Sequence, residues 1–302
     1  MSGPKSLNKP REHKHLPATI IDGKTLAAGV RARVAADAAK IRERWGRPPG
    51  LAVVLVGEDP ASQVYVRNKR RICDEVGIRS FAHDLPASTT ENHLLELIAE
   101  LNHRSEVDGI LVQSPLPAPL AFGKILEAVD PAKDVDGLHP YNLGRMFSGN
   151  PLFVSCTPAG VMEMIRSTGV PLAGKKAVVI GRSNLVGKPL AMLLLQAHAT
   201  VTICHSRTVD LATECRQADV LAVAAGRPNC VLGDWIKPGA VVVDIGTNRV
   251  AGALVGDVEF AKARERAGFI SPVPGGVGPM TIAELMANTV LAARKKMEAT
   301  CG

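Results

Sequence analysis

The hydrophobic residues of this 302-residue chain fall into short continuous runs, separated by longer segments in which apolar and polar positions are mixed. Short runs rich in valine, leucine and isoleucine are typical of strands buried on both faces of a parallel sheet. The longer segments place their apolar residues on one face of a helix. Strands and helices that alternate in this way predict βαβ units and an α/β fold. We predict strands over 51–56, 78–85, 109–112, 176–180, 200–204, 220–224 and 240–245.

Residues with known preferences for helix ends delimit the predicted helices. Asp59 and Pro60 read as an N-cap followed by proline at the first helical position. Gly77 reads as the end of the same helix, which predicts a helix from Pro60 to Val76. Two further helices are predicted over 24–45 and 189–196. Three more are predicted to begin at the capping box of Ser88 and Glu91, at Thr157 and at Thr281.

The length of the chain and a break in its composition predict two domains. A single hydrophobic core rarely grows beyond about 250–300 residues. Residues 130–151 are rich in proline, glycine, aspartate and asparagine, and this segment is the candidate boundary. The predicted strands before and after it are therefore assigned to two different sheets.

Charge and composition disfavour nucleic acid as the partner. The net charge is +7, but residues 1–17 supply four basic residues and a single acid. Nearly half of the excess therefore lies in what we predict to be a flexible basic tail. Aromatic residues make up only 3% of the chain, which leaves few side chains on which bases could stack. An anionic small molecule suits this composition better.

The sequence offers no signal for a membrane, a disulfide framework or a metal site. No apolar run approaches the roughly 18 residues of a membrane-spanning helix, and the basic tail lacks the apolar segment of a secretory signal. None of the six cysteines forms a Cys-x-x-Cys pair. Most of them lie in apolar runs, where a reduced thiol behaves as a small hydrophobe. We therefore expect a cytoplasmic protein without metal ligands.

The clearest local motif is a buried strand that leads through Gly181, Arg182 and Ser183 into a helix. Backbone N–H groups at such a turn face the phosphates of a bound dinucleotide. Ser183 stands where the motif G-x-G-x-x-G has its second glycine, so a plain strand–helix turn remains an alternative.

The following strand indicates which dinucleotide is bound. A site for NAD usually has an acidic residue at the end of this strand, which binds the ribose 2′-hydroxyl. Here the strand is followed by Ser206 and Arg207, with no acid. A hydroxyl and a guanidinium suit a 2′-phosphate, and Arg182 can reach it from the glycine turn. These residues predict NADP, and the alternative is that they are solvated surface cations.

Polar residues near the ends of two N-terminal strands predict a substrate site. Tyr65 and Lys69 are four residues apart on the predicted helix over 60–76, so they share one face. Alone, such a pair is more often a packed phenol beside a solvated ammonium. The helix starts, however, at the carboxyl edge of the sheet, where ligands bind, and Gln113 ends another strand there.

Two loops complete the set of candidates. The segment Lys133–Gly137 contains Asp134 and Asp136. It could form a simple Asx turn, or the carboxylate of Asp136 could accept hydrogen bonds from a heterocycle. The segment Pro272–Pro279 contains three glycines, which permit close approach of the backbone to a ligand.

Taken in order, these motifs resemble a known family. The chain is similar to the bifunctional methylenetetrahydrofolate dehydrogenase/methenyltetrahydrofolate cyclohydrolase family, the FolD type, from about Ile21 to its C-terminus. Several independent motifs in the family's order make a chance match implausible. The matching segments are Tyr65–Lys69, Val112–Pro117, Lys133–Gly137, Cys156–Pro158, Gly181–Ser183 and Pro272–Thr281.

The resemblance implies an architecture and a two-step reaction. Residues 18–150 together with 280–302 are expected to form a three-layer α/β catalytic domain, and 151–279 a Rossmann-type NADP-binding domain, with a cleft between them. The resemblance also implies a homodimer. It implies that NADP oxidises 5,10-methylene-tetrahydrofolate to the methenyl cation, and that this cation is then hydrolysed to 10-formyl-tetrahydrofolate.

The resemblance also assigns roles to residues. Lys69 is implied as the central catalytic group, Tyr65 as the residue that orients the folate, Gln113 as the partner of the lysine and Asp136 as the residue that holds the pterin. The implied substrate-binding residues are Tyr65, Val112, Gln113, Ser114, Asp136, Pro274, Gly275, Gly276, Val277 and Gly278. The resemblance implies that Gly181, Arg182 and Ser183 bind the cofactor. The cofactor-binding set also contains Ser206 and Arg207, predicted above from the residues themselves, and Thr247, which stands at a family position near the nicotinamide.

The second reaction makes a demand on Lys69. Addition of water to the methenyl cation needs a proton acceptor, which an ammonium group is not. We therefore predict a lowered pKa for Lys69, caused by partial burial and by the nearby Arg67, Arg70 and Arg71.

Three positions depart from the family pattern. Ser114 replaces a common leucine, Ser155 a typical proline and Thr247 a usual isoleucine, but no catalytic group is lost.

Three other functions are alternatives. One rival is a dehydrogenase without the hydrolytic step. A second is a different doubly wound oxidoreductase acting on small hydroxy acids, and a third is a basic nucleic-acid-binding protein. The second rival leaves the N-terminal motifs unexplained.

Overall fold

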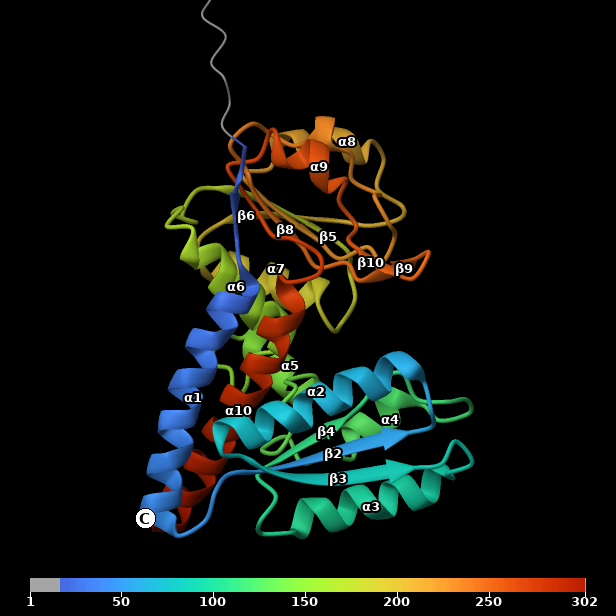
Figure 1. Cartoon of the computed structure of the whole chain (residues 1–302), viewed down its shortest axis with the longest axis vertical. Coiled ribbons are helices and arrows are strands. Elements are labelled where there is room, and N and C mark those ends of the chain that lie inside the picture. The colour runs from blue at the N-terminus through green and yellow to red at the C-terminus, as the bar shows by residue number, and fades with distance from the viewer. Residues whose placement is uncertain (1–16, 302) are drawn as a thin grey trace, which may run out of the picture.

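The computed structural model describes residues 17–301, so the predicted flexible basic tail lies almost wholly outside the described residues. Two parallel sheets form the centres of two α/β domains, which lie one above the other in Figure 1. This is the predicted fold class: an α/β catalytic domain and a Rossmann-like domain.

The smaller sheet has three parallel strands in the order β3-β2-β4. The long helix α2 covers one face, and α3 lies on the other face (Figure 1). The strand β2 is buried along its whole length, as its uninterrupted apolar sequence predicts. The strands are β2 (Gly50–Val56), β3 (Arg79–Leu85) and β4 (Gly109–Val112). The helices in the N-terminal half of the chain are α1 (Gly23–Trp45), α2 (Pro60–Val76), α3 (Glu91–His103), α4 (Phe122–Glu127) and α5 (Pro140–Phe147).

The larger sheet has six parallel strands in the order β1-β11-β8-β7-β5-β6. Chain order reverses next to β5, which is the arrangement of a doubly wound sheet. The strands are β1 (Thr19–Ile20), β5 (Lys176–Ile180), β6 (Thr200–Cys204), β7 (Val220–Val223), β8 (Val241–Asp244) and β11 (Phe269–Ile270). A separate hairpin consists of β9 (Asn248–Val250) and β10 (Ala253–Val255). The helices are α6 (Cys156–Ser167), α7 (Gly187–Gln196), α8 (Leu211–Gln217), the 3₁₀ turn η1 (Gly233–Trp235), α9 (Phe260–Arg264) and α10 (Val277–Cys301).

Two long helices join the domains. Figure 1 shows α1 and α10 side by side, running from the level of the larger sheet to that of the smaller one. Their apolar faces belong to one core cluster together with α2, α6 and one side of both sheets. Further clusters fill the outer faces of the larger and the smaller sheet. Segment 18–22 pairs with the larger sheet through β1, although the rest of the N-terminal half builds the smaller one.

Helix α2 has the bounds that its sequence predicts. Asp59 accepts a hydrogen bond from the backbone N of Ser62 over 2.8 Å, Pro60 occupies the first turn, and Gly77 ends the helix with a φ of 75°. The predicted capping box before α3 is wrong. Thr90 is the N-cap and accepts from the backbone N of His93, and the helix begins at Glu91.

The last helix begins earlier than its sequence predicts. α10 starts at Val277, inside the glycine-rich segment, and not at Thr281. Gly276 lies against the first residue of α1, since a Cβ on Gly23 would come within 1.8 Å of the carbonyl oxygen of Gly276. Packing on α1 therefore fixes this end of α10, which no local capping signal in the sequence could indicate.

Candidate active site

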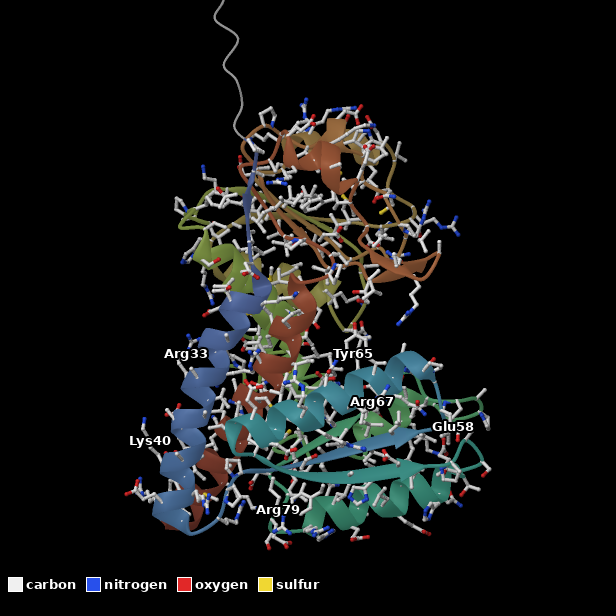
Figure 2. All side chains as sticks on the ribbon, in the orientation of Figure 1. Arg33, Lys40, Glu58, Tyr65, Arg67 and Arg79 are labelled. Carbon is white, nitrogen blue, oxygen red and sulfur yellow. The ribbon has the colours of Figure 1, made fainter. Side chains whose placement is uncertain are left out.

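A cavity of about 710 Å³ lies between the two domains. Tyr65 on α2 forms part of its wall from the catalytic domain, and Figure 2 shows this residue where α2 faces the upper domain. The opposite wall consists of the carboxyl end of β8, the residues that follow it, and the loop before α10. Of the predicted substrate and cofactor residues, those that line the cavity are Tyr65, Thr247, Pro274, Gly275, Gly276, Val277 and Gly278.

The predicted catalytic lysine lies one helical turn further along α2. Lys69 is only 9% exposed, and its Nζ donates to Oε1 of Gln113 over 2.9 Å. Gln113 follows the last residue of β4, Val112, which is itself buried. The amide of Gln113 is held from its other side, where Nε2 donates to the backbone oxygen of Ser114 over 2.7 Å. The sequence predicts that Lys69 and Gln113 lie at the same sheet edge, and in the structure their side chains are in contact.

Asp136 is the next charged group around Lys69. The loop that carries Asp136 is fixed by Asp134, whose carboxylate accepts from the backbone N of His139 and from Nδ2 of Asn142, each over 2.8 Å. Burial lowers the pKa of Lys69 and raises that of Asp136, while their mutual attraction opposes both changes.

The cause of the lowered Lys69 pKa differs in part from the prediction. Burial of the ammonium is the dominant cause, as expected. The neighbouring arginines do not contribute. Arg70 pairs with Asp84, Arg71 pairs with Glu75, and Arg67 is exposed. Helical periodicity explains this result, because residues one or two positions from Lys69 point to other faces of α2.

Cys156 and Asn288 pack behind the carboxylate loop. The thiol of Cys156 donates to the backbone oxygen of Val135 over 3.3 Å, and burial raises its pKa well above the ordinary value. The amide of Asn288 on α10 donates to the backbone oxygens of Val135 and Val154, each over 2.9 Å. These contacts tie the loop next to Asp136 to helix α10. Ser155, one of the departures from the family pattern, is buried at the start of α6.

The predicted phosphate-binding turn joins β5 to α7. Gly181 has a φ of 122°, and a Cβ there would come within 2.3 Å of the backbone oxygen of Ala224. Only glycine fits this close approach of two strand ends. Ser183 stabilises the turn, since its Oγ accepts from the backbone N of Val186 over 3.1 Å. This role explains why a serine replaces the second glycine of the motif.

The residues predicted to hold a 2′-phosphate lie on the rim of the same sheet edge. Arg182, Ser206 and Arg207 are exposed. Within residues 17–301 neither guanidinium forms an ion pair, so both are available to an anion. Arg182 and the pair Ser206–Arg207 follow neighbouring strands, β5 and β6.

Several residues of the cavity were not predicted from the sequence. The cations Lys24 and Arg31 of α1 and Arg71 of α2 line it, as does Asp244 at the end of β8. Lys24 and Arg31 are seven residues apart, a spacing that places them on one face of α1 and that could have identified them. Among the described residues no group of three or more histidine, cysteine or acidic side chains could hold a metal ion. None of the helices within 17–301 has both the length and the apolar character to cross a membrane.

A glycine turn on a doubly wound sheet, a buried lysine in the second domain and a cavity between the two domains are the features of a two-domain dinucleotide-dependent enzyme. Comparison with known proteins gives its family. Residues 21–136 match the tetrahydrofolate dehydrogenase/cyclohydrolase catalytic domain, and residues 155–297 match the NAD(P)-binding domain of the same family. The chain belongs to the tetrahydrofolate dehydrogenase/cyclohydrolase family.

Individual relatives agree with this assignment over nearly the whole chain. The bifunctional protein FolD 2 of Geobacter metallireducens is 58% identical over 282 residues, which cover 93% of this chain and 99% of the relative. The crystal structure of the Campylobacter jejuni bifunctional enzyme FolD has a TM-score of 0.90 at 46% identity and covers 92% of this chain and 99% of its own. A Trypanosoma brucei enzyme of the same name, solved with NADP cofactor and an inhibitor, has a TM-score of 0.90 at 40% identity and covers 93% and 99%.

Proposed function

We propose that this chain oxidises 5,10-methylene-tetrahydrofolate with NADP and then hydrolyses the product to 10-formyl-tetrahydrofolate, as an enzyme of one-carbon metabolism. The observation that carries the proposal is the buried Lys69, which Gln113 holds one helical turn from Tyr65. Tyr65 lies in the wall of a cavity whose opposite wall includes the carboxyl end of β8 in the dinucleotide-binding sheet. Membership of the family and the names of its relatives support it.

The residues of the larger domain fit NADP. Gly181 lets the ends of β5 and β7 approach closely, and the turn after it leads to the N-terminus of α7, where a diphosphate would bind. Arg182 and Arg207, which form no ion pair with any residue from 17 to 301, flank the place of a 2′-phosphate. We assign Gly181 and Ser183 to the diphosphate, Arg182, Ser206 and Arg207 to the 2′-phosphate, and Thr247 to the nicotinamide side. When bound, NADP supplies the hydride acceptor.

For the first step the protein provides orientation. The carbon that loses hydride lies between two nitrogens, so the cation that forms is delocalised and needs neither acid nor base. Tyr65 and the loop of Pro274–Gly278 enclose the substrate in the cavity. Asp136 accepts hydrogen bonds from the pterin, and Val112, Gln113 and Ser114 form the floor beneath it.

For the second step the protein provides a base. Lys69, as the neutral amine, takes a proton from water while the water oxygen bonds to the methenyl carbon. The new hydroxyl group then loses its proton to form the C=O bond, the bond from that carbon to N5 breaks, N5 takes up a proton, and the carbon remains on N10 as a formyl group. Oxygen, carbon and charge balance, because the methenyl cation and water give 10-formyl-tetrahydrofolate and one proton.

Two assays of the wild-type protein test the proposal. Methylene-tetrahydrofolate with NADP should yield NADPH and, by mass spectrometry, 10-formyl-tetrahydrofolate. Methenyl-tetrahydrofolate alone should lose its chromophore faster than in buffer without protein. NADPH without accelerated hydrolysis would instead identify a monofunctional dehydrogenase, and activity in neither assay would reject the folate assignment.

We further propose that the protein is cytoplasmic and acts as a homodimer. The free cysteines Cys73, Cys156, Cys204, Cys215 and Cys230 are consistent with a reducing compartment. The hairpin β9–β10 exposes Val250, which is 45% accessible, and an exposed apolar side chain on a two-stranded hairpin suits contact with a second copy. Light scattering of the purified protein gives the oligomeric state directly.

A further inference from the structure

Two buried carboxylates lie beside the predicted cofactor loops, and no role assigned above uses them. Asp244 is the last residue of β8 and is 2% exposed, while Asp257 follows β10 and is fully buried. Neither forms an ion pair with any residue between 17 and 301. A buried carboxylate without a cation is stable only where N–H donors surround it, so the donors show what each carboxylate holds.

The carboxylate of Asp257 holds the loop that follows β7. Its Oδ2 accepts from the backbone N of Ala225 over 2.6 Å and of Gly226 over 2.8 Å. Its Oδ1 accepts from the backbone N of Arg227 over 2.9 Å and from Nδ2 of Asn248 over 2.8 Å. Three successive backbone groups and one side chain are therefore bound to a single carboxylate.

The carboxylate of Asp244 holds the segment that carries Asp257. Oδ1 of Asp244 accepts from the backbone N of Asp257 over 2.9 Å and of Gly246 over 3.0 Å. Oδ2 accepts from the backbone N of Val258 over 2.9 Å. The two acids thus form a chain of contacts, the carboxylate clasp of Asp244 and Asp257, which runs from the end of β8 to the end of β7.

Two glycines show how closely the clasp is packed. A Cβ on Gly246 would lie 2.1 Å from Cγ of Asp257. A Cβ on Gly256 would lie 1.9 Å from Oδ2 of Asp244. Neither carboxylate has room to move, so the backbone that each one binds is fixed in place.

The clasp lies beside the loops after β5, β7 and β8 at the cofactor edge of the sheet. The loop bound by Asp257 begins after Ala224, whose carbonyl oxygen is the atom that Gly181 approaches. Asp244 itself lines the interdomain cavity together with Gly246 and Thr247. Ligands of a doubly wound sheet bind at the carboxyl ends of its strands, so the loops after β5, β7 and β8 are among those that a dinucleotide contacts.

We infer that Asp244 and Asp257 are positioning residues for the dinucleotide, which set its affinity through the loops after β7 and β8. This inference rests on the proposed function only in naming NADP as the dinucleotide. Asp257 does not line the interdomain cavity and is not bonded to Lys69 or Gln113, so hydrolysis of methenyl-tetrahydrofolate does not depend on its carboxylate. Loss of the clasp therefore separates the two activities.

The test replaces Asp257 by asparagine and measures binding of NADPH by fluorescence titration. A primary amide has one acceptor oxygen where the carboxylate has two, so Asp257→Asn turns an NH₂ group toward two N–H donors. We expect the Kd of NADPH to rise roughly tenfold or more, because two buried N–H donors lose their acceptor and the loop that carries them moves. Hydrolysis of methenyl-tetrahydrofolate should stay within about twofold of the wild type.

A matched control lies in the same domain. Asp219 also accepts a backbone N–H, from Lys176 over 2.9 Å, but it precedes β7 and lies at the amino edge of the sheet. Asp219→Asn should leave the Kd of NADPH unchanged. If it raises the Kd as much as Asp257→Asn does, the effect is general loosening of the domain and the inference is wrong.

A milder variant decides the matter if Asp257→Asn does not fold. Asn248→Ala removes one of the four donors to Asp257 and leaves the carboxylate in place. It should raise the Kd of NADPH a few-fold with hydrolysis retained, and an unchanged Kd would overturn the inference. The titration needs no turnover. Failure of the proposed folate reactions in the wild type would therefore be seen separately from failure of the clasp.

Discussion

Nζ of Lys69 lies 2.9 Å from Oε1 of Gln113, and this contact joins helix α2 to the end of strand β4. Both the ammonium and the neutral amine can donate in this hydrogen bond, so the contact holds the lysine in place without deciding its charge. Burial decides the charge, because it lowers the pKa of Lys69 toward the range in which an amine can accept a proton from water.

Replacing Gln113 by glutamate tests this relationship. A carboxylate beside Nζ stabilises the ammonium, so Gln113→Glu should raise the pKa of Lys69. The neutral amine is then populated only at higher pH, and hydrolysis at pH 7 should fall by about tenfold or more. The pH–rate profile of hydrolysis should move to higher pH. Gln217→Glu, which adds the same charge on exposed α8, is the control. A reduced rate with an unmoved profile would contradict the account.

Removing the two rim arginines should change cofactor choice. Arg182→Ala with Arg207→Ala deletes the cations assigned to the 2′-phosphate, and charge-assisted contacts of this kind contribute roughly 1.5–3 kcal/mol each when formed. For the two positions together this corresponds to a rise in the KM for NADP of roughly 100-fold or more, while the KM for NAD should stay nearly constant. Arg216→Ala, an exposed arginine on α8, should change neither. An equal rise of both KM values would show that the arginines do not recognise the 2′-phosphate.

Glu284 on α10 should make stability fall as pH rises. Burial raises its pKa from 4.5 to about 7, helped by Glu163 and opposed by Arg33 and Arg166. The folded state therefore binds more protons than the unfolded state between those values, and ionisation of Glu284 costs stability as pH increases. Glu284→Gln removes the cost. Its gain in unfolding free energy at pH 8 should exceed the gain at pH 5 by about 2 kcal/mol.

Urea denaturation at the two pH values measures this difference. Glu298→Gln, at an exposed position of the same helix, is the control and should show no such dependence. A gain that is equal at pH 5 and pH 8 would mean that Glu284 ionises in the folded state as it does in the unfolded one.

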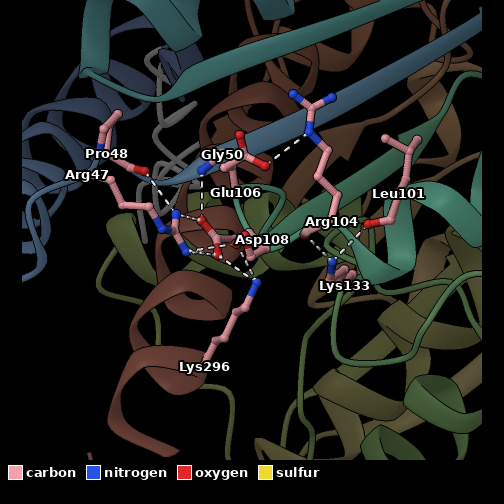
Figure 3. Close-up of polar contacts among 10 residues, drawn as sticks. Arg47, Pro48, Gly50, Leu101, Arg104, Glu106, Asp108, Lys133 and Lys296 are labelled. Carbon is pink, nitrogen blue, oxygen red and sulfur yellow. Dashed lines mark hydrogen bonds and ion pairs between the residues drawn. The ribbon is translucent and has the colours of Figure 1, made fainter. Parts of the chain in front are cut away.

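Asp108 should contribute to stability and not to catalysis. It lies at the amino end of β4, opposite Gln113, and its fully buried side chain binds Arg47 through two hydrogen bonds of 2.7 Å (Figure 3). It also accepts from the backbone N of Gly50 over 2.9 Å. Asp108→Asn leaves the arginine without its charge partner and should cost about 3 kcal/mol of unfolding free energy.

The exposed pair Asp37–Lys40 is the matched control. The side chains of Asp37 and Lys40 are 49% and 75% exposed, so Asp37→Asn should cost less than about 1 kcal/mol. Turnover per folded molecule should be unchanged in Asp108→Asn. A loss of hydrolysis in the folded variant would show that this network reaches the site.

Local signals in the sequence were enough for the elements that carry the predicted catalytic groups. The N-cap at Asp59 and the glycine at 77 set the ends of α2, and the apolar run of β4 set the position of Gln113. Because the carboxyl ends of parallel strands share one edge, Tyr65, Lys69 and Gln113 could be placed together without knowledge of the strand order.

Contacts between distant segments could not be predicted in this way. The pairing of β1 with β11 joins residues about 250 positions apart, and nothing local marks it. The start of α10 depends on the contact between Gly23 and Gly276. Asp244 ends an apolar strand and Asp257 follows a hairpin, and only the folded chain shows which backbone groups their carboxylates bind.

The most direct test of the central claim follows the absorbance of methylene-tetrahydrofolate with purified wild type and Lys69→Met, each with NADP and with NAD. We expect the wild type to form the methenyl chromophore with NADP and then to accelerate its decay. We expect this acceleration of the decay to be lost in Lys69→Met. Decay that continues in Lys69→Met at the wild-type rate would contradict the assignment of Lys69 as the base, and no turnover with either cofactor would contradict the folate function itself.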